Sequence, residues 1–209
     1  MVPVGGKPII EILLSRFRKA GVKKAHLAVN HFADQIVSHL GDGSSLGMRI
    51  VYSKEAVPLS TVGPIKLMKD LPETFLVANG DVLTDLNVKD LYDFHVERQA
   101  ELTVATIHRE DRIDYGVLET ADDNTVTGFT EKPSYSFRVS MGIYVFSKSI
   151  LEIVPEGEPY GFDDLVLELL RRKSRLLSYP YSGYWQDIGR PEDYARVQED
   201  VVTIKGLVD

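Results

Sequence analysis

TFLVANGD (Thr74–Asp81) joins a short apolar run to a polar turn, and this stretch is the strongest single indication of the fold. Four to eight apolar, β-prone residues bounded by turn residues are typical of a buried strand. Asn79, Gly80 and Asp81 follow the apolar run, at the carboxyl end of the predicted strand. Ligands of open α/β sheets bind at that end. The stretch therefore predicts a central strand that leads directly into a candidate site.

Helices and strands alternate on both sides of this stretch through the first half of the chain. Apolar residues recur at three- and four-residue spacing in the helical segments, and short apolar runs mark the strands. We expect helices at Ile9–Ala20, Phe32–Leu40, Thr61–Lys69 and Val88–Ala100, and strands at Ala25–Asn30, Met48–Ser53 and Glu101–His108. Such alternation predicts a parallel α/β sheet with helices on both faces.

The pattern changes after residue 110, where predicted strands follow one another closely. We expect strands at Asp114–Thr120, Thr125–Thr130, Phe137–Phe146 and Leu176–Tyr181, and helices at Lys148–Val154, Phe162–Lys173 and Pro191–Val202. Closely spaced strands joined by the turn residues Asp122-Asp123-Asn124 indicate antiparallel pairing. The sequence therefore predicts one α/β domain over residues 1–209, with an antiparallel excursion in its second half.

Composition excludes several classes of function. The 209 residues include 31 acidic and 24 basic side chains, a net charge of −7, which argues against a nucleic-acid partner. The chain has no cysteine, so disulfides, thiolate nucleophiles and Cys-ligated metal centres are excluded and a reducing cytoplasm is expected. No apolar run approaches the ~20 residues that a membrane span needs. MVPVGGKPII does not resemble a signal peptide, so we expect a soluble cytoplasmic protein without a membrane partner.

Two acidic positions are candidates for a metal site. A carboxylate at the rim of the sheet, such as Asp81, can hold Mg²⁺, which prefers oxygen ligands and bridges phosphates. Asp187 in YWQDIG is a candidate second carboxylate for the same cation. Each position also has a structural interpretation. Asn-Gly-Asp is typical of a turn, and the aromatic side chains of Tyr184 and Trp185 can pack in a core before a turn.

Other residues suggest contacts with a substrate. Lys132 is suited to a phosphate, and Glu131 can accept hydrogen bonds from sugar hydroxyls, although a solvated Glu–Lys loop is the favoured interpretation of this pair taken alone. Gly116 and Gly142 lie in or beside predicted strands. A glycine there marks close approach by a ligand or another backbone, or a bulge. The five histidines show no metal-ligand spacing.

Eight motifs occur together and in one order: VPVGGKPIIEILL, a helix and strand, PLSTVGP, VANGDVLTDL, YGVLE, FTEKP, GIYVF and WQDIGRPEDY. That order resembles the sugar-nucleotide pyrophosphorylases, the nucleotidyltransferases that join a sugar 1-phosphate to an NTP. Mannose-1-phosphate guanylyltransferases and glucose-1-phosphate thymidylyltransferases belong to this family. The resemblance runs from residue 1 to about residue 200, and it implies a Rossmann-like, mixed but mostly parallel sheet.

The resemblance implies a role for each matching position. Asp81 and Asp187 match the two metal-binding aspartates of the family, and Lys132 would neutralise the attacking phosphate. The sugar and its phosphate would contact Gly116, Glu131, Lys132 and Gly142, with Asn79 and Gly80 beside them. Pro58, Ser60, Thr61 and Gly63 match the loop that touches the nucleotide base. Mg²⁺, a sugar 1-phosphate and an NTP are the implied cofactor and substrates, and the sequence leaves a homo-oligomer open.

Two departures from the family pattern affect this expectation. The family opens with a buried strand, a Gly-rich loop ending in Gly-Thr-Arg-Leu and a Pro-Lys-Pro, whereas this sequence starts at Met1-Val2-Pro3-Val4. We therefore expect a truncated or mis-started form of a longer enzyme that lacks the first central strand. The strands at Ala25–Asn30 and Thr74–Asn79 would then pair directly, leave backbone unpaired or admit another segment. Ser60 and Val62 replace residues that are often Gly and Ala and would narrow the base site.

The implied activity is nucleotidyl transfer that forms an NDP-sugar and releases pyrophosphate. A second interpretation is a non-catalytic sugar-phosphate-binding or regulatory homologue that lacks the triphosphate loop. A third is a metal-dependent glycosyltransferase, which would usually present Asp-x-Asp, whereas the carboxylate after Asp81 is Asp85. The sequence does not identify the sugar or the base, although GGKPII and WQDIGRPEDY lean towards guanylyl- and mannose- or heptose-type members.

Overall fold

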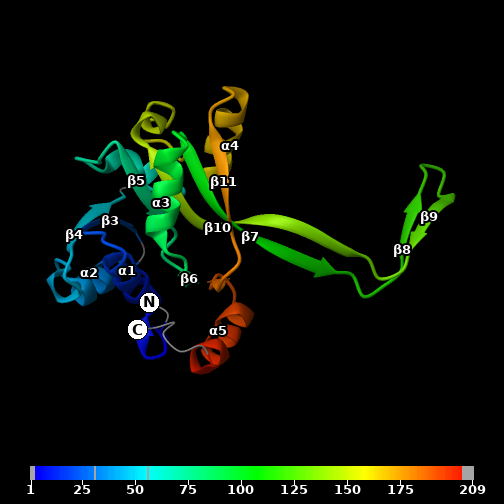
Figure 1. The fold of residues 1–209 in the computed structure, drawn as a ribbon, viewed down its shortest axis with the longest axis horizontal. Coiled ribbons are helices and arrows are strands. Elements are labelled where there is room, and N and C mark those ends of the chain that lie inside the picture. Colours follow the sequence, from blue (N-terminus) through cyan, green and yellow to red (C-terminus); the bar gives the residue numbers. More distant parts are fainter. Residues whose placement is uncertain (1–2, 31, 56, 204–209) are drawn as a thin grey trace.

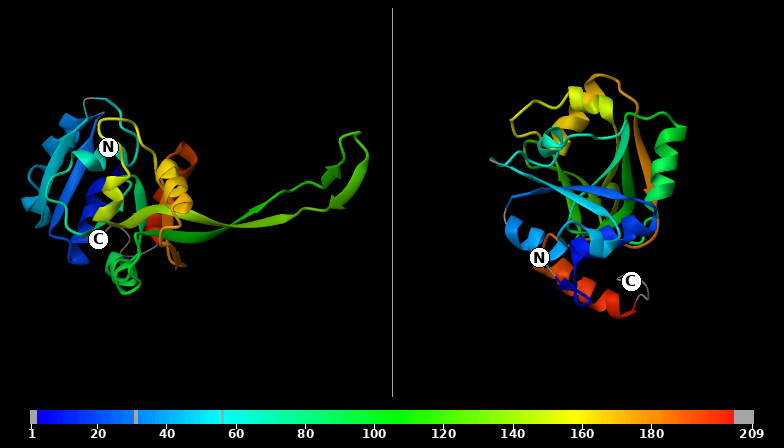
Figure 2. Two further views of the ribbon diagram at one scale, coloured as in Figure 1. Left: turned by 90° about the horizontal axis from the view of Figure 1, so that it is seen from above. Right: turned by 90° about the vertical axis from the view of Figure 1, so that its left-hand side faces the viewer.

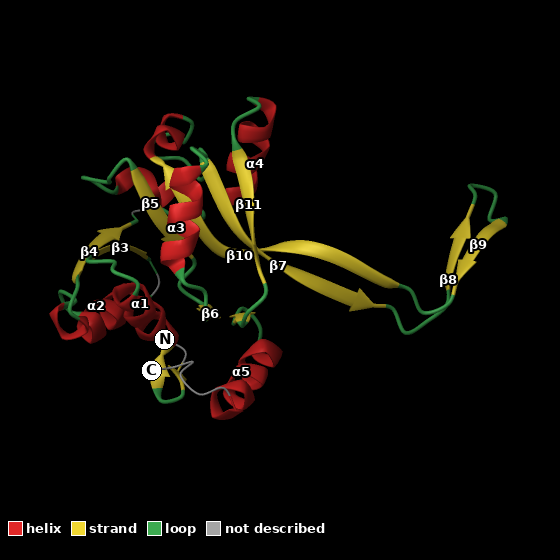
Figure 3. Ribbon diagram, viewed as in Figure 1, coloured by secondary structure: helices red, strands yellow, loops and turns green. Residues whose placement is uncertain are grey.

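The computed structural model describes residues 3–30, 32–55 and 57–203. The first half contains β1 (Pro3–Val4), β2 (Lys7–Pro8), α1 (Ile9–Lys19), β3 (Lys24–Val29), α2 (Ala33–Leu40), β4 (Arg49–Lys54), β5 (Thr74–Ala78), β6 (Val82–Thr84) and α3 (Val88–Glu97). The second half contains β7 (Leu102–Arg112), β8 (Val117–Thr120), β9 (Val126–Thr130), β10 (Ser134–Ser147), α4 (Phe162–Arg171), β11 (Leu176–Tyr181), β12 (Trp185–Asp187) and α5 (Pro191–Thr203). Figures 1 and 3 show their arrangement.

A four-stranded sheet in the order β11-β7-β10-β5 forms the centre of the molecule. β11 is parallel to β7, and β10 is antiparallel to both β7 and β5. It follows that β5, β7 and β11 run in one direction and only β10 runs against them. β3 and β4 form a separate parallel pair. The expected α/β fold, Rossmann-like with a mixed but mostly parallel sheet, is confirmed.

Helices cover both faces of the central sheet because β10 alternates its apolar side chains. Tyr144 and Phe146 pack on one face with Leu165 and Leu169 of α4. Ile143 and Val145 point to the other face, where Leu91 of α3 is fully buried. Successive residues of a strand face opposite sides, so one apolar strand supplies two cores. This two-sided burial fixes β10 as the central strand and holds its neighbours in register.

A long two-stranded arm leaves this sheet. β7 and β10 pair antiparallel from Thr106 and Ser140 out to Arg112 and Ser134, and β8 pairs with β9 beyond them. Two perpendicular views show the arm protruding from the body (Figures 1 and 2). We call residues 106–140 the arm. It confirms the antiparallel excursion predicted from the spacing of strands after residue 110.

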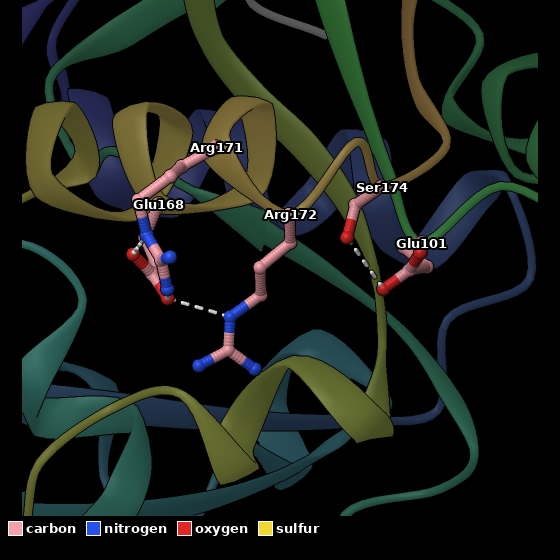
Figure 4. A network of polar contacts seen from close by, with 5 residues as sticks. All are labelled: Glu101, Glu168, Arg171, Arg172 and Ser174. Atoms are coloured by element: carbon pink, nitrogen blue, oxygen red, sulfur yellow. Dashed lines mark hydrogen bonds and ion pairs between the residues drawn. The ribbon is translucent and has the colours of Figure 1, made fainter.

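The end of α4 is attached to the start of β7 by polar contacts (Figure 4). Glu168 accepts two hydrogen bonds of 2.8 Å from Arg171 and one of 2.6 Å from Arg172. These guanidinium donors lower the pKa of the Glu168 carboxyl to about 2. Ser174 Oγ donates to Glu101 Oε2 at 3.1 Å, so the turn after the helix is held beside the β7 strand.

Most predicted elements are confirmed to within a few residues, but two predicted helices are wrong in type. Thr61–Lys69 and Lys148–Val154 contain only 3₁₀ turns, at Gly63–Leu67 and Lys148–Glu152. Pro64 lacks an N–H group and Gly63 is a poor helix former, so apolar spacing alone misjudged the first segment. The short β1, β2 and β6 strands were not predicted, because two or three residues show no periodicity. No helix within the described residues is long and apolar enough to cross a membrane.

Candidate active site

The structure brings Asp81 and Asp187 together, although 105 intervening residues separate them in the sequence. β6, which begins directly after Asp81, pairs antiparallel with β12, and Asp187 lies opposite Val82 in this ladder. The N–H of Ile188 donates to the Asp81 carbonyl at 3.1 Å. The two carboxylates therefore stand beside each other at the carboxyl end of β5, where the sequence predicted a site.

The environment of Asp187 disfavours its charge in the protein alone. Burial raises the pKa of the Asp187 carboxyl, and the negative charge of Asp81 raises it further. The N–H of Gly189 and the charge of Arg190 act in the opposite direction. Asp187 Oδ1 is buried and has no hydrogen-bond partner. Buried polar oxygens are nearly always satisfied in native proteins, so this oxygen indicates a missing ligand.

The pair fits a divalent cation that is shared with phosphates. Two adjacent carboxylates, one of which has an unsatisfied buried oxygen, are donors that a hard cation such as Mg²⁺ takes, with phosphate and water oxygens completing the set. Within the described ranges, no group of three or more His, Asp or Glu side chains is placed to hold a metal. The side chains form a partial site rather than a closed cage, as expected where a substrate supplies ligands.

Asn79, Gly80 and Gly142 line the same corner. The N–H of Asn79 donates to the Gly142 carbonyl at 2.9 Å. Gly142 has a φ of +71°, and a Cβ atom there would lie 2.9 Å from Asn79 Nδ2. The glycine therefore lets β10 approach the Asn79 side chain. Both residues were predicted near the substrate, and the structure places them against each other beside Asp81.

A cavity of about 1000 Å³ opens beside Asp81, between β3 and β5. Its lining is mostly apolar and includes Ala28 of β3, Leu76 of β5 and Asp81. In the described residues, β3 pairs only with β4 and β5 pairs only with β10. The sequence left three arrangements open for these strands: direct pairing, unpaired backbone, or a further segment between them. The structure shows that β3 and β5 do not pair directly.

The predicted base loop is attached to the segment that precedes α4. Thr61 Oγ1 accepts a hydrogen bond from the Phe162 N–H at 2.9 Å, and the N–H of Gly63 donates to the Tyr160 carbonyl at 3.0 Å. Pro58 and Ser60 are exposed. Thr61 also lines the cavity that reaches Asp81. The loop thus borders the candidate site, while Thr61 and Gly63 each have a structural task.

Gly116, Glu131 and Lys132 lie elsewhere, at the bend between the β7–β10 ladder and the β8–β9 hairpin. A Cβ atom on Gly116 would lie 2.5 Å from the Phe129 ring and 3.2 Å from Glu131 Oε2. Lys132 has a φ of +45° and interrupts the ladder. The structure therefore brings Gly116 and Glu131 together, as the motifs implied, but on the arm and away from the carboxylates (Figure 1).

Residues that were not singled out also position the carboxylates. Trp185 Nε1 donates to the Met141 carbonyl at 2.8 Å, which fixes β12 against β10. Gln186 Nε2 donates to Asp193 Oδ1 at 3.1 Å and ties β12 to α5. The positive charge of Arg190 lowers the pKa of Asp187. The only sequence signal for these residues was their place in the WQDIGRPEDY motif.

Asp85 is already engaged elsewhere. It accepts hydrogen bonds from the Tyr181 hydroxyl and from the Tyr184 N–H, the latter at 2.7 Å. Burial raises the pKa of Tyr181, and its hydrogen bond to Asp85 adds to the shift. A carboxylate that holds this turn is poorly available as a second metal ligand. The geometry thus weighs against an Asp81–Asp85 metal pair of the glycosyltransferase kind.

Comparison with protein families matches residues 1–203 to the nucleotidyl transferase family model. Among curated proteins, the chain is 33% identical over 201 residues to the mannose-1-phosphate guanylyltransferase catalytic subunit beta of Drosophila pseudoobscura pseudoobscura, covering 93% of this chain and 54% of that protein. It is 32% identical over 211 residues to the mannose-1-phosphate guanylyltransferase of Mycobacterium tuberculosis, covering 97% and 58%. The chain therefore spans a little more than half the length of these relatives.

Among solved structures, HddC from Yersinia pseudotuberculosis is similar with a TM-score of 0.74 and 27% identity, covering 96% of this chain and 88% of that one. A second structure of HddC, described as a complex with GMP-PN, is similar with a TM-score of 0.72 and 25% identity, covering 96% and 88%.

Proposed function

The chain belongs to the nucleotidyl transferase family, and we propose that it joins a sugar 1-phosphate to a nucleoside triphosphate with release of pyrophosphate. In this reaction a phosphate oxygen of the sugar phosphate forms a bond to the α-phosphorus, and the bond from that phosphorus to pyrophosphate breaks. The single observation that favours this function most is the adjacency of Asp81 and Asp187, with a buried Asp187 oxygen that lacks a partner.

The residues present fit Mg²⁺ as the cofactor. Asp81 and Asp187 would hold the ion, which when bound stabilises negative charge on the transferred phosphate and the leaving oxygens. The sugar phosphate is itself a nucleophile, so the protein needs chiefly to orient the two substrates and offset their charge. We assign charge neutralisation on the sugar phosphate to Lys132, sugar contacts to Glu131 and Gly116, and the nucleotide side to the loop from Pro58 to Gly63.

GTP is the nucleotide to test first. The curated relatives described above are mannose-1-phosphate guanylyltransferases by name, and HddC is described in complex with GMP-PN. We therefore propose a guanylyl transfer to a mannose- or heptose-type sugar 1-phosphate. Replacing GTP by UTP or dTTP at equal concentration should lower the rate of pyrophosphate release, because pocket contacts with the base discriminate between nucleotides.

The decisive variants are Asp81→Ala and Asp187→Ala. Each should abolish Mg²⁺-dependent pyrophosphate release, measured with a coupled phosphate assay, because one remaining carboxylate binds the ion weakly. Asp34→Ala, which removes an exposed carboxylate from α2, is the matched control and should keep the rate. Direct titration with Mn²⁺ gives a second measure, in which Asp187→Ala should weaken binding. Near-full activity in either site variant would contradict the assignment.

A second candidate is a sugar-phosphate-binding homologue without transferase activity. The observation that favours it is the open space between β3 and β5, because no strand borders that side of the carboxylate site in the described residues. Calorimetry separates the two functions. The transferase should bind both a sugar 1-phosphate and GTP with Mg²⁺, whereas the binding homologue should take only the sugar 1-phosphate.

A further inference from the structure

One face of the arm carries exposed apolar side chains, and we call it the apolar face. In the β7–β10 ladder, directly paired residues share a face, so Tyr135, Phe137 and Val139 lie together with Ile107. The ion pair of Arg109 and Asp111 lies on the same face, beside the two aromatic rings. Tyr135 is 44% exposed and Phe137 is 48% exposed. The opposite face is polar and carries Ser134, Ser136, Arg138, Ser140, His108, Glu110 and Arg112. Two half-exposed aromatic side chains on one face of a ribbon favour packing of that face against another surface.

The hairpin at the end of the arm is even more exposed. Leu118 pairs with Phe129 across β8 and β9, and these side chains are 57% and 63% exposed. Tyr115 is 78% exposed. An isolated two-stranded hairpin is only marginally stable in water, and monomeric proteins rarely expose contiguous apolar surface of this kind. The arm therefore requires a covering surface outside its own two strands.

The length of the arm separates the residues proposed to bind the sugar phosphate from the carboxylates of the same chain. Gly142, at the root, accepts a hydrogen bond from Asn79 next to Asp81. Lys132 lies ten residues further along the same extended stretch of chain. A strand advances ~3.4 Å per residue, so Lys132 stands on the order of 30 Å from the root, about the diameter of a small domain. Its side chain cannot span that distance.

We infer that two copies of this chain exchange arms, so that each candidate site contains Asp81 and Asp187 from one copy and Glu131 and Lys132 from the other. This inference rests on the proposed function. In one chain alone, the carboxylates of Asp81 and Asp187 on the body lie far from Glu131 and Lys132 on the arm. A second copy supplies the missing half to both, and two-fold symmetry makes the exchange reciprocal. The apolar face of each arm would be buried in the same contact.

Complementation between two defective variants tests the inference. Asp187→Asn damages the body half of the site and Lys132→Ala damages the arm half. When the two chains are unfolded, mixed at equal amounts and refolded, half of the dimers contain both kinds of chain. Each mixed dimer has one site with both lesions and one with neither, so about a quarter of the wild-type rate should return. No recovery beyond the sum of the two variants overturns the inference.

Assembly can be measured without activity. Light scattering during gel filtration should give twice the chain mass of 23.4 kDa for the wild type. Phe137→Ser, on the apolar face, should shift the mass towards one chain. Arg138→Ser, on the polar face of the same strand, is the matched control and should remain dimeric. A monomeric wild type at micromolar to near-millimolar concentration overturns the inference.

Cross-linking identifies which parts of the two copies meet, and the absence of cysteine makes it clean. One chain carries Thr130→Cys beside Glu131, and the other carries Arg190→Cys beside the carboxylates. A short bismaleimide should join the two chains into one covalent dimer. A cross-link formed within a single chain carrying both changes, with none between chains, overturns the inference. If the wild type catalyses no transfer, the proposed function fails, while mass and cross-linking still decide whether arms are exchanged.

Discussion

At Gly142 the backbone combines a positive φ of +71° with close contact to a neighbouring side chain. A Cβ atom would lie 2.9 Å from Asn79 Nδ2 and 3.3 Å from Val82 Cγ2, in the corner beside Asp81. Gly142→Ala should therefore destabilise the fold by ~1–2 kcal/mol from the backbone conformation, with a further cost from the clash. Urea unfolding measures the sum.

Gly157 provides the matched control for this prediction. Its φ of +73° is nearly the same, but a Cβ atom at this position would have no neighbour within 4 Å. Gly157→Ala should show the backbone cost alone. The excess for Gly142→Ala is then the contact with Asn79, and it should come with a loss of pyrophosphate release. Equal unfolding free energies in the two variants would contradict the close approach.

The ionised carboxylate of Asp187 should lower the free energy of unfolding when no metal is bound. Its carboxyl has a raised pKa, chiefly because of burial and then because of Asp81. A folded pKa above the unfolded value means that the folded state binds the proton more strongly, so ionisation at neutral pH costs stability, and that cost disappears at acidic pH. Asp187→Asn should raise the melting temperature at pH 7.5 in EDTA, because the amide removes the cost of ionising this carboxyl.

The same variant should lose the stabilisation that Mg²⁺ gives the wild type, because a ligand that binds only the folded state raises its stability. Differential scanning calorimetry with and without the ion measures both effects. A lower melting temperature for Asp187→Asn in EDTA at pH 7.5 would show that the carboxylate is stabilised by contacts within the protein.

The positions of the two aspartates at the edge of the sheet were the most predictable part of the site. Asp81 was predicted from its position directly after an apolar strand, and the structure places it at that strand end. Asp187 was selected by its motif, and the β6–β12 ladder brings it to Asp81. The unsatisfied Asp187 oxygen could not be predicted, because it depends on a network that only the folded backbone defines. The chemical roles of both residues stay predictions.

The packing of α3 on the central sheet includes a buried titratable residue. His95 is 1% exposed, and its ring nitrogens lie 2.9 Å from Thr103 Oγ1 of β7 and 3.2 Å from Ser147 Oγ of β10. Burial lowers the pKa of His95 below its ordinary value of 6.5. The unfolded chain therefore takes up a proton at a higher pH than the folded one. Stability is full above pH 6.5 and declines as the pH falls towards the lowered folded pKa.

We expect the free energy of unfolding to decrease between pH 6.5 and 5 by at most about 1.4 kcal/mol per pH unit for each such histidine. His95→Gln, which keeps a polar side chain but does not titrate, should reduce this slope. His108→Gln changes an exposed histidine on the arm and should leave it unchanged. Urea unfolding curves at four pH values measure the slope. An unchanged slope in His95→Gln would exclude its role.

Helices and strands with long apolar periodicity were predicted correctly. The prediction was wrong for a segment that contains glycine and proline. α1 and β11 were predicted from their apolar spacing almost to the residue. The segment from Gly63 to Leu67 forms a 3₁₀ turn, in which a Cβ atom on Gly63 would lie 3.0 Å from both the Glu158 carbonyl oxygen and Leu59 Cβ. Strand pairing was harder still, since the long β7–β10 ladder depends on contacts between residues far apart in sequence.

At the scale of the molecule, the edges of β3 and β5 that face the cavity have no strand partner within the described residues. Unpaired strand edges next to apolar surface promote association between chains. Ala28→Lys should reduce aggregation at high protein concentration, because an exposed lysine on the β3 edge opposes pairing with another strand. Light scattering recorded over time measures the rate of aggregation. Ala195→Lys, on exposed α5, adds the same charge elsewhere and should give a smaller effect.

The arrangement of the whole molecule could be predicted only in part. The α/β class followed from the alternation of elements, whereas the direction in which the arm leaves the sheet did not. That direction depends on the irregularity between Ser140 and Tyr144, where the β7–β10 register shifts and Gly142 has its positive φ. A single glycine in a strand indicates a bulge or a close contact, but it does not specify an angle. The position of Lys132 relative to Asp81 was therefore beyond sequence reasoning.

With the proposed exchange of arms, the rate of the proposed reaction would depend on the abundance of the chain. When half of every site comes from a second chain, dilution below the dissociation constant of the dimer separates the two halves, and turnover per molecule falls with them. A modest decrease in synthesis would then lower the supply of sugar nucleotide more than proportionally. The cell would obtain a threshold response from mass action alone, without an effector or a regulatory domain.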